Sequence, residues 1–169
     1  MASLGYRFGV AHCNFQLRGA ESDEDEVTVA REAARYGVPC YNRRFDTAAE
    51  MERTGESMEM TARRLRYAWF EELRREHGYA AIAVAHHADD SIETFFINLL
   101  RGTGLRGLTG ISTRMGRVVR PLMFASRREI LEYAVAQKIP FREDSSNRST
   151  KYLRNKIRLG LIPRIREIN

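Results

Sequence analysis

Two histidines and two aspartates stand close together near the middle of this sequence, in the stretch His86-His87-Ala88-Asp89-Asp90. An imidazole and a carboxylate held side by side can position a nucleophile, a proton or an ion beside a bound ligand. We therefore favour the interpretation that one of these imidazoles and one of these carboxylates belong to a nucleotide-binding or phosphoryl-transfer site.

Two other interpretations of these residues stay open. Their nitrogen and oxygen atoms suit a transition metal, although adjacent histidines on a strand point to opposite faces and cannot bind one ion without a bend. The other interpretation is structural. Asp89 and Asp90 would cap the following helix, Glu93 would stand where a capping box places its carboxylate, and His87 would lie in the core.

A strand and a helix are expected to position these side chains. Residues 80–85 form a short apolar run typical of a fully buried strand. The helix is expected over Ser91–Arg101, burying Ile92, Phe96 and Leu99 or their neighbours. The polar residues thus begin where the expected strand ends, and open α/β sheets bind ligands at this end of their strands.

A glycine-rich stretch follows this helix. The residues Gly102-Thr103-Gly104-Leu105-Arg106-Gly107 match the dinucleotide-binding pattern in their letters. That pattern should follow a strand and open a helix, whereas here it closes one. We therefore interpret Gly102 as the end of the helix.

Strands and helices alternate through the first two thirds of the chain, which predicts an α/β fold. We expect a Rossmann-like, doubly wound, mostly parallel sheet with helices on both faces. The carboxyl ends of parallel strands meet at one edge, so His12, Asp46 and His86 should gather there. The expected elements are a strand over Tyr6–His12, a helix capped by Ser22 and ended by Gly37, a strand over Val38–Phe45, a polar stretch over Asp46–Glu56 and a long helix over Ser57–His77.

The pattern changes after Gly110. We divide the chain there into residues 1–112, a partial α/β domain, and residues 113–169, a basic continuation of the same catalytic domain. The elements expected in the second part are a strand over Arg117–Arg120, a helix with a capping box from Ser126 to about Gln137, a polar loop over Glu143–Asn147 and a basic helix over Thr150–Arg158 that ends before Gly160.

The net charge of +6 is concentrated at the end of the chain. From Arg148 onward there are seven basic residues and one acidic residue, whereas the first 147 residues hold 21 of each. Such a cluster favours contact with a polyanion. We expect contacts to a nucleic-acid backbone from Arg148, Lys151, Arg154 and Lys156.

Composition excludes other classes of protein. The two cysteines, Cys13 and Cys40, are too few for a disulfide-stabilised fold. No apolar run reaches the roughly 18 residues that a membrane span needs. We expect a cytoplasmic protein without membrane contact.

Six motifs occur in register along nearly the whole chain. They are Ala11–Gly19 with Glu21–Asp23, Ala62–Tyr67, Ala85–Thr94, Arg101–Gly104 with Gly107–Ile111, Arg120–Leu122, and Glu143–Asn147 with Arg154–Arg158. Together these motifs resemble the bacterial tRNA(Ile)-lysidine synthetases of the PP-loop (N-type) ATP pyrophosphatase superfamily. The resemblance implies an adenine nucleotide alpha hydrolase-like fold.

The resemblance implies a carbon–nitrogen ligase with a two-step reaction. ATP, as its Mg²⁺ complex, adenylates the C2 oxygen of the wobble cytidine of tRNA(Ile) with a CAU anticodon. The side-chain amine of free L-lysine then displaces AMP. No tightly bound cofactor is implied for this chain.

The resemblance also implies site residues. Arg66, His86, Asp90 and Arg158 match active-site residues of the family. The two arginines would balance phosphate or transition-state charge, Asp90 would hold the lysine ammonium or the Mg²⁺ of ATP, and His86 would position the nucleotide or its substrate. Residues expected to bind ATP or substrate are His12, Asn14, Arg18, Gly102, Thr103 and Gly104.

One motif of the superfamily, a Ser-Gly-Gly-x-Asp-Ser loop, does not occur in these 169 residues. We expect an internal fragment that lacks the first βα unit and the C-terminal domains. Its sheet edge would be open to pairing in a homodimer. The missing loop would supply N–H groups to the ATP phosphates, so the fragment by itself should be inactive.

Three other functions stay open. A tRNA thiolase of the same superfamily would usually carry a cysteine pair, which Cys13 and Cys40 do not form. A non-catalytic tRNA-binding module would use the basic segment alone. A metal-dependent phosphohydrolase would use the histidine and aspartate cluster.

Titration of the 169-residue chain with MgATP tests the role of the missing loop. We expect no binding in the micromolar range, because the chain lacks the backbone donors that would surround the phosphates. Isothermal titration calorimetry measures this directly. A micromolar Kd would contradict the expectation.

Overall fold

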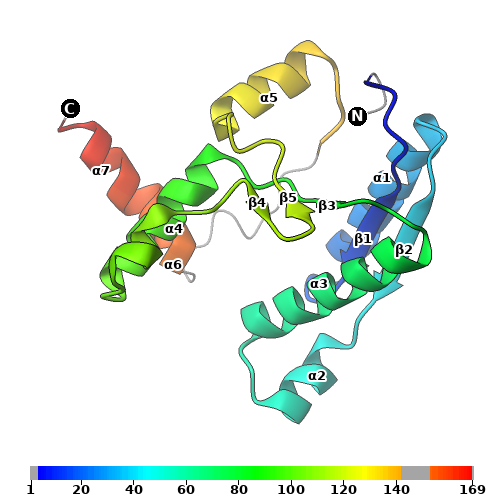
Figure 1. Cartoon of the computed structure of the whole chain (residues 1–169), viewed down its shortest axis with the longest axis horizontal. Helices are drawn as coiled ribbons and strands as arrows, with labels where there is room; N and C mark the ends of the chain where they lie inside the picture. The colour runs from blue at the N-terminus through cyan, green and yellow to red at the C-terminus, as the bar shows by residue number, and fades with distance from the viewer. Residues whose placement is uncertain (1–3, 142–152, 169) are drawn as a thin grey trace. The chain divides into compact units, whose positions relative to one another are not determined.

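The computed structural model describes residues 4–141 and 153–168, apart from the side chain of Arg106. The chain forms two compact units, Met1–Ile82 and Ala83–Asn169, which we describe separately (Figure 1). This boundary differs from the functional division at residue 112, which stays a prediction. The loop over Glu143–Asn147 and the residues Arg148 and Lys151 lie outside the described residues.

The first unit contains a parallel strand pair joined by a helix. Strand β1 (Val10–Asn14) pairs with β2 (Cys40–Arg44) in a register that runs from Val10↔Cys40 to Asn14↔Arg44. The crossover is α1 (Ala20–Arg35). A parallel pair needs such a crossover, so this unit confirms the α/β class.

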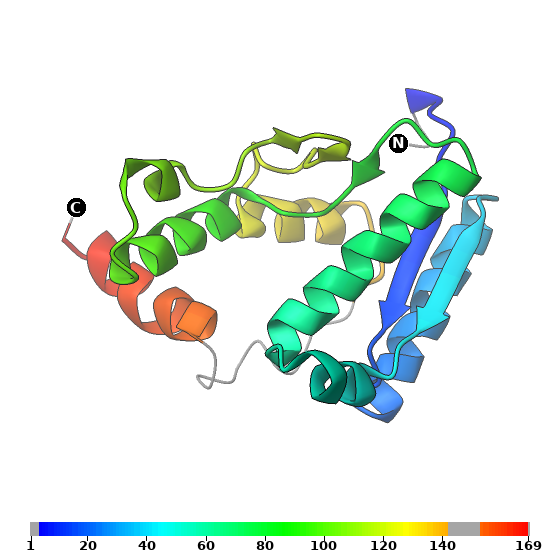
Figure 2. The same cartoon turned by 60° about the horizontal axis from the view of Figure 1, so that its bottom comes forward.

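Helices cover both faces of this pair, as expected for a doubly wound sheet (Figure 2). Successive side chains on a strand point to opposite faces. Asn14 and Arg44 face α1, because they contact Asp23 and Glu26. The opposite face meets α3 (Met58–Glu76), where the Arg43 guanidinium lies over the Trp69 ring, 5.2 Å from its centroid.

The long helix α3 confirms its predicted boundaries. The Ser57 side chain accepts a hydrogen bond from Met60 N at 3.4 Å, and His77 caps the carboxyl end. Trp69 and Leu73, which lie four residues apart and so share one face of the helix, are buried. An apolar face of this period packs a helix against a sheet.

Three details of the first unit differ from expectation. Helix α1 begins at Ala20, so Ser22 lies within it, and its Oγ accepts a hydrogen bond from Arg18 N instead of capping the helix. Strand β1 ends at Asn14, which places His12 in mid-strand rather than at the sheet edge. The polar stretch contains an unpredicted short helix, α2 (Thr47–Thr54), capped by Asp46 through Ala49 N at 3.0 Å.

The expectation of a fully buried strand over residues 80–85 is wrong. Only β3 (Ile82–Ala83) pairs, next to β5 (Val118–Val119) in a sheet whose third strand is β4 (Arg114–Met115). Ala83 and Ala85 are exposed. A run of small apolar residues can be buried, but it becomes buried only where neighbouring strands cover it. The antiparallel β4–β5 hairpin was not predicted either.

Helix α4 (Ala88–Leu100) buries acidic side chains, whereas apolar side chains were expected to be buried. Ile92 and Leu99 are 40% and 48% exposed, whereas Glu93 is fully buried. The prediction of an apolar core face at these two positions is therefore wrong. The reason is that α4 packs its acidic side chains against arginines of the C-terminal segment.

The second capping box is confirmed. Helix α5 (Arg127–Ala136) starts after Ser126, whose Oγ accepts from Glu129 N while the Glu129 carboxylate accepts from Ser126 N. This reciprocal pair satisfies two backbone donors at the helix start. Asp89 of α4 adds a third partner, since its Oδ2 accepts from Arg127 N at 2.7 Å.

The C-terminal helical segment continues past the glycine at which we expected it to end. It consists of α6 (Leu153–Lys156), a π-helical turn η4 (Ile157–Leu161) and α7 (Ile162–Arg166). Pro163 lies at the start of α7 and has no N–H to donate. The wider turn, in which Ile162 N donates to Ile157 O, carries the helix through Gly160. Within residues 4–141 and 153–168, no helix is both long and apolar enough to span a membrane.

Replacing Gly110 with Ala should destabilise the protein. Gly110 has φ +71° and ψ −145°, a conformation open almost only to glycine, and an added Cβ would lie 2.2 Å from Ser91 Oγ. We expect a loss of about 2 kcal/mol in the free energy of unfolding, measured by urea denaturation.

Gly104→Ala is the matched control. Gly104 has φ −66°, and no atom lies within 4 Å of the position its Cβ would take. This variant should unfold at the wild-type urea concentration. Equal destabilisation by both substitutions would contradict the account of Gly110.

Candidate active site

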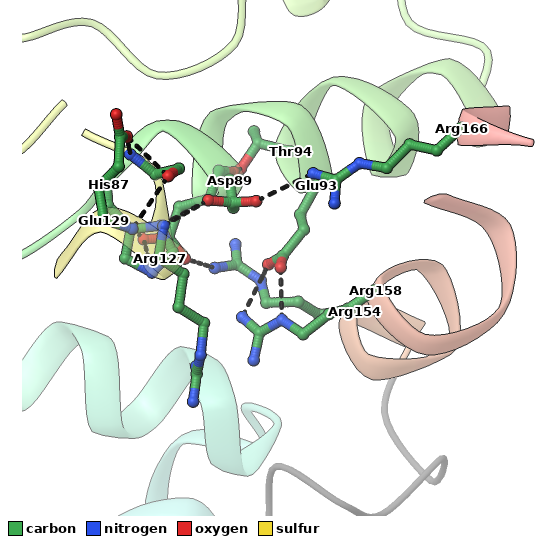
Figure 3. A network of polar contacts seen from close by, with 11 residues as sticks. His87, Asp89, Glu93, Thr94, Arg127, Glu129, Arg154, Arg158 and Arg166 are labelled. Carbon is green, nitrogen blue, oxygen red and sulfur yellow. Dashed lines mark hydrogen bonds and ion pairs between the residues drawn. The ribbon is translucent and has the colours of Figure 1, made fainter. Parts of the chain in front are cut away.

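The first turns of α4 carry three carboxylates, from Asp89, Asp90 and Glu93, toward the C-terminal helical segment (Figure 3). Residues three and four apart share one face of a helix. Asp90 and Glu93 therefore point the same way, and both are buried. This acidic face is the centre of the candidate site in the second unit.

The start of α4 explains how Asp90 is held. His87 is the capping residue, and its backbone N–H donates to Asp90 Oδ2 at 3.0 Å. Asp90 is therefore the third helical residue and supplies the carboxylate of the capping box. It is not the capping residue, and Glu93 is not part of the box. The expectation was wrong by one turn because the helix starts at Ala88 rather than Ser91.

Glu93 is the most deeply buried of these side chains, with 0% exposure. Arg158 approaches it with two nitrogens: Nε donates to Oε1, and Nη2 donates to Oε2 at 3.1 Å. This hydrogen bonding to Glu93 raises the pKa of Arg158 above its ordinary value. The sequence motifs pointed to Arg158, whereas Glu93 was expected only to take part in a helix cap. Its spacing of three residues from Asp90 was the available signal.

Two further arginines complete the cluster. Arg154 Nη1 lies 3.2 Å from Asp90 Oδ1, and Arg154 Nε lies 3.7 Å from Glu93 Oε2. Arg166 Nη2 lies 3.5 Å from Asp89 Oδ1. Figure 3 shows these side chains reaching α4 from the C-terminal segment. Among the residues that the structure describes, three carboxylates therefore meet three guanidinium groups.

The histidines do not form a metal site with the carboxylates. His87 Nδ1 lies 3.8 Å from Asp89 Oδ2, and Nε2 lies 3.5 Å from Asp90 Oδ2. His86 is partly buried. Among the residues that the structure describes, no group of three or more histidine, cysteine or acidic side chains is arranged to hold a metal ion.

The glycine-rich stretch folds back onto the end of α4. Arg101 caps the helix, and Gly102 follows with φ +69°, which confirms the helix terminus. Thr103 Oγ1 donates to Asn98 O at 3.1 Å, and Asn98 Nδ2 donates to Gly107 O at 2.7 Å. These contacts fix the loop, and they leave the expected ATP-binding role of Gly102, Thr103 and Gly104 as a prediction.

In the first unit, Asn14 anchors the loop at the end of β1. It is 2% exposed, and its Nδ2 donates to Asp23 Oδ1 and Glu26 Oε2, both at 3.0 Å. Its Oδ1 accepts from Gln16 N at 2.9 Å. Arg18, farther along the loop, pairs with Asp25 at 2.7 Å. Asn14 therefore shapes this loop by its own hydrogen bonds.

Arg66 of α3 lies beside the same strand. Its guanidinium stands over the Phe15 ring, 5.1 Å from the centroid. Burial raises the pKa of the Cys13 thiol to about 11, although nearby Arg66 opposes the shift. Burial also lowers the pKa of His12 below its ordinary value. Within the described part of the chain, Arg66 has no carboxylate partner.

Comparisons with known proteins relate the whole chain to one group. Residues 2–165 match the family described as the PP-loop domain. The chain is 48% identical to the tRNA(Ile)-lysidine synthase of Parabacteroides distasonis over 169 residues, covering 100% of this chain and 39% of that protein. The synthase of Chlorobaculum tepidum is also 48% identical, over 97% of this chain and 50% of its own length.

The chain therefore spans at most about half the length of these curated relatives. Among solved structures, the U34-tRNA thiolase of Methanococcus maripaludis matches 94% of this chain and 56% of its own with a TM-score of 0.71. At 13% identity this likeness concerns the fold alone.

The match over residues 2–165 agrees with the parallel α/β unit and with the order of the sequence motifs. The chain belongs to the PP-loop domain family.

Proposed function

We propose that this chain is part of a tRNA(Ile)-lysidine synthase. One observation carries the proposal: curated proteins of that name are 48% identical to it over 97–100% of its length. The match to the Parabacteroides distasonis protein covers the whole chain and so includes every element that carries a candidate site residue.

The proposed reaction has two steps. ATP adenylates the C2 oxygen of the wobble cytidine in tRNA(Ile) with a CAU anticodon and releases pyrophosphate. The side-chain amine of L-lysine then attacks C2, forms the carbon–nitrogen bond and displaces AMP. ATP would enter as its Mg²⁺ complex, and we place the reaction in the cytoplasm.

In the second unit, Asp90 is the proposed partner of the lysine ammonium. Its carboxylate lies at a helix start, 13% exposed, and accepts only one backbone hydrogen bond, from His87 N, among the described residues. Coordination of Mg²⁺ by the same carboxylate oxygens is the alternative proposal. Arg158 is engaged by Glu93 on two nitrogens, so we assign it to holding the acidic face of α4 as well as to balancing phosphate charge.

In the first unit, Arg66 is the proposed phosphate partner. Its guanidinium lies over an aromatic ring and has no carboxylate partner within residues 4–141 and 153–168, so its charge is available to a ligand. His12, Asn14 and Arg18 would shape the adjoining loop for ATP. In the C-terminal segment Lys156 is exposed and suits a tRNA contact.

A thiolase reaction fits the chain less well. Cys13 and Cys40 lie on neighbouring strands but not opposite each other. Cys13 is opposite Arg43, and Cys40 is opposite Val10. A thiolate nucleophile needs a lowered pKa, whereas that of Cys13 is raised to about 11. The solved thiolase supports the fold and not this activity.

Asp90→Asn in the full-length enzyme tests the assignment of Asp90. We expect kcat/KM for lysine to fall about 100-fold, because the amide keeps the hydrogen bond to His87 N but loses the charge that holds an ammonium. Lysidine formation is measured by mass spectrometry of the tRNA. Asp89→Asn removes the same charge one residue away and should leave the KM for lysine within about threefold of wild type.

An unchanged KM for lysine in Asp90→Asn would refute the lysine role. A selective rise in the KM for MgATP would instead assign this carboxylate to the metal.

Arg66→Ala tests the phosphate role. We expect the rate of tRNA adenylation to fall about 100-fold, because a charge that stabilises the transferring phosphate group is lost. The readout is pyrophosphate release before lysine is added. Arg63→Ala, one turn earlier on the same helix and stacked on Tyr67 at 4.9 Å, is the control and should keep most activity. Equal rates in the two variants would count against Arg66.

A further inference from the structure

Arg154 lies on the carboxylate that we assign to the lysine ammonium. Its Nη1 is 3.2 Å from Asp90 Oδ1, on the oxygen that His87 N leaves open. Its Nε is 3.7 Å from Glu93 Oε2. The guanidinium of this chain therefore occupies the position at which a cationic substrate would neutralise Asp90.

The pairing within the cluster shows what Arg154 neutralises. Glu93 has its own bidentate partner in Arg158, and Asp89 is paired with Arg166. In the part of the chain that the structure describes, Arg154 is thus the permanently charged partner of Asp90. An ammonium and Arg154 on the same carboxylate would repel each other.

Arg154 is more easily displaced from these carboxylates than Arg158. Its side chain is 36% exposed, whereas that of Arg158 is 21% exposed. It makes one close contact, at 3.2 Å, instead of two parallel hydrogen bonds. Departure of Arg154 would leave Glu93 paired with Arg158.

The surroundings of Arg154 favour a polyanion. Lys156 and Arg164 are exposed on the same segment, and neither has an acidic partner within residues 4–141 and 153–168. Guanidinium groups bind phosphate through two parallel hydrogen bonds, and such a contact competes well with a single carboxylate contact.

We propose that Arg154 is a switch between the amine site and the RNA. In the absence of RNA it occupies Asp90, and an RNA phosphate draws it away, which opens Asp90 to the amine of lysine. Lysine binding is then coupled to tRNA binding, and the amine is admitted when its acceptor is present. This inference rests on the proposed function, which itself names neither the coupling nor this role of Arg154.

The coupling is measured first in the wild-type full-length enzyme. Equilibrium dialysis with labelled L-lysine gives its Kd with and without saturating tRNA(Ile), in the absence of ATP so that no reaction occurs. We expect lysine to bind about tenfold more tightly with tRNA, a typical size for coupling between two sites. By linkage, lysine should tighten tRNA binding by the same factor. A lysine Kd that does not respond to tRNA would overturn the proposal without any variant.

Arg154→Gln then tests the residue. Without tRNA this variant should bind lysine about tenfold more tightly than wild type, and tRNA should add little, because the competing charge is gone. Arg166→Gln, which frees Asp89 instead of Asp90, should keep the wild-type response. A merely structural role for Arg154 would weaken lysine binding in the variant, and that result would refute the switch.

Arg154→Lys guards against a folding defect. It keeps the positive charge near Asp90, so it should retain a tRNA-dependent Kd for lysine, while thermal melting checks the fold of each variant. Lysidine formation by the wild-type enzyme separates the two levels of the proposal. If lysidine forms but the Kd values are uncoupled, the switch is wrong and the proposed function stands. If no lysidine forms, the proposed function itself fails.

Discussion

The arrangement of the second unit depends on one ion pair, between the fully buried carboxylate of Glu93 and the guanidinium of Arg158. A buried carboxylate is costly unless a charged partner satisfies both of its oxygens. Arg158 does so with two nitrogens. Because breaking such a pair costs about 3–5 kcal/mol, the C-terminal helical segment is held against α4 at this point.

The apolar and polar faces of α4 follow from this pair. Ile157 and Ile162 of the C-terminal segment are buried, while Ile92 and Leu99 of α4 are exposed. The segment thus supplies apolar contacts beside the arginines, and α4 supplies the acids. The π-helical turn η4 contains Arg158, and its wider geometry carries the segment past Gly160 to Arg166. All three acids of α4 therefore meet an arginine from one segment.

The first unit is organised by a buried neutral side chain, Asn14, instead of a buried ion pair. Asn14 uses a neutral amide to tie the end of β1 to the start of α1, and this buried group has its hydrogen bonds satisfied. Arg66 stays without a carboxylate partner in the described residues and is steadied by Phe15 instead. An arginine neutralised by the protein organises structure, whereas one held by an aromatic ring keeps its charge for a ligand. This contrast underlies the different roles proposed for Arg158 and Arg66.

The sequence by itself determined the α/β class, the limits of α3, the capping box of α5 and the helix end at Gly102, because caps, glycines and apolar periodicity act over a few residues. The order of its motifs also indicated the family. Tertiary structure alone decided which face of α4 is buried and that Glu93 belongs to the site, since Arg154 and Arg158 lie more than 60 residues away in the chain. It likewise decided that the apolar run before α4 forms only a two-residue strand. Burial and ion pairing depend on partners distant in sequence, which local patterns do not encode.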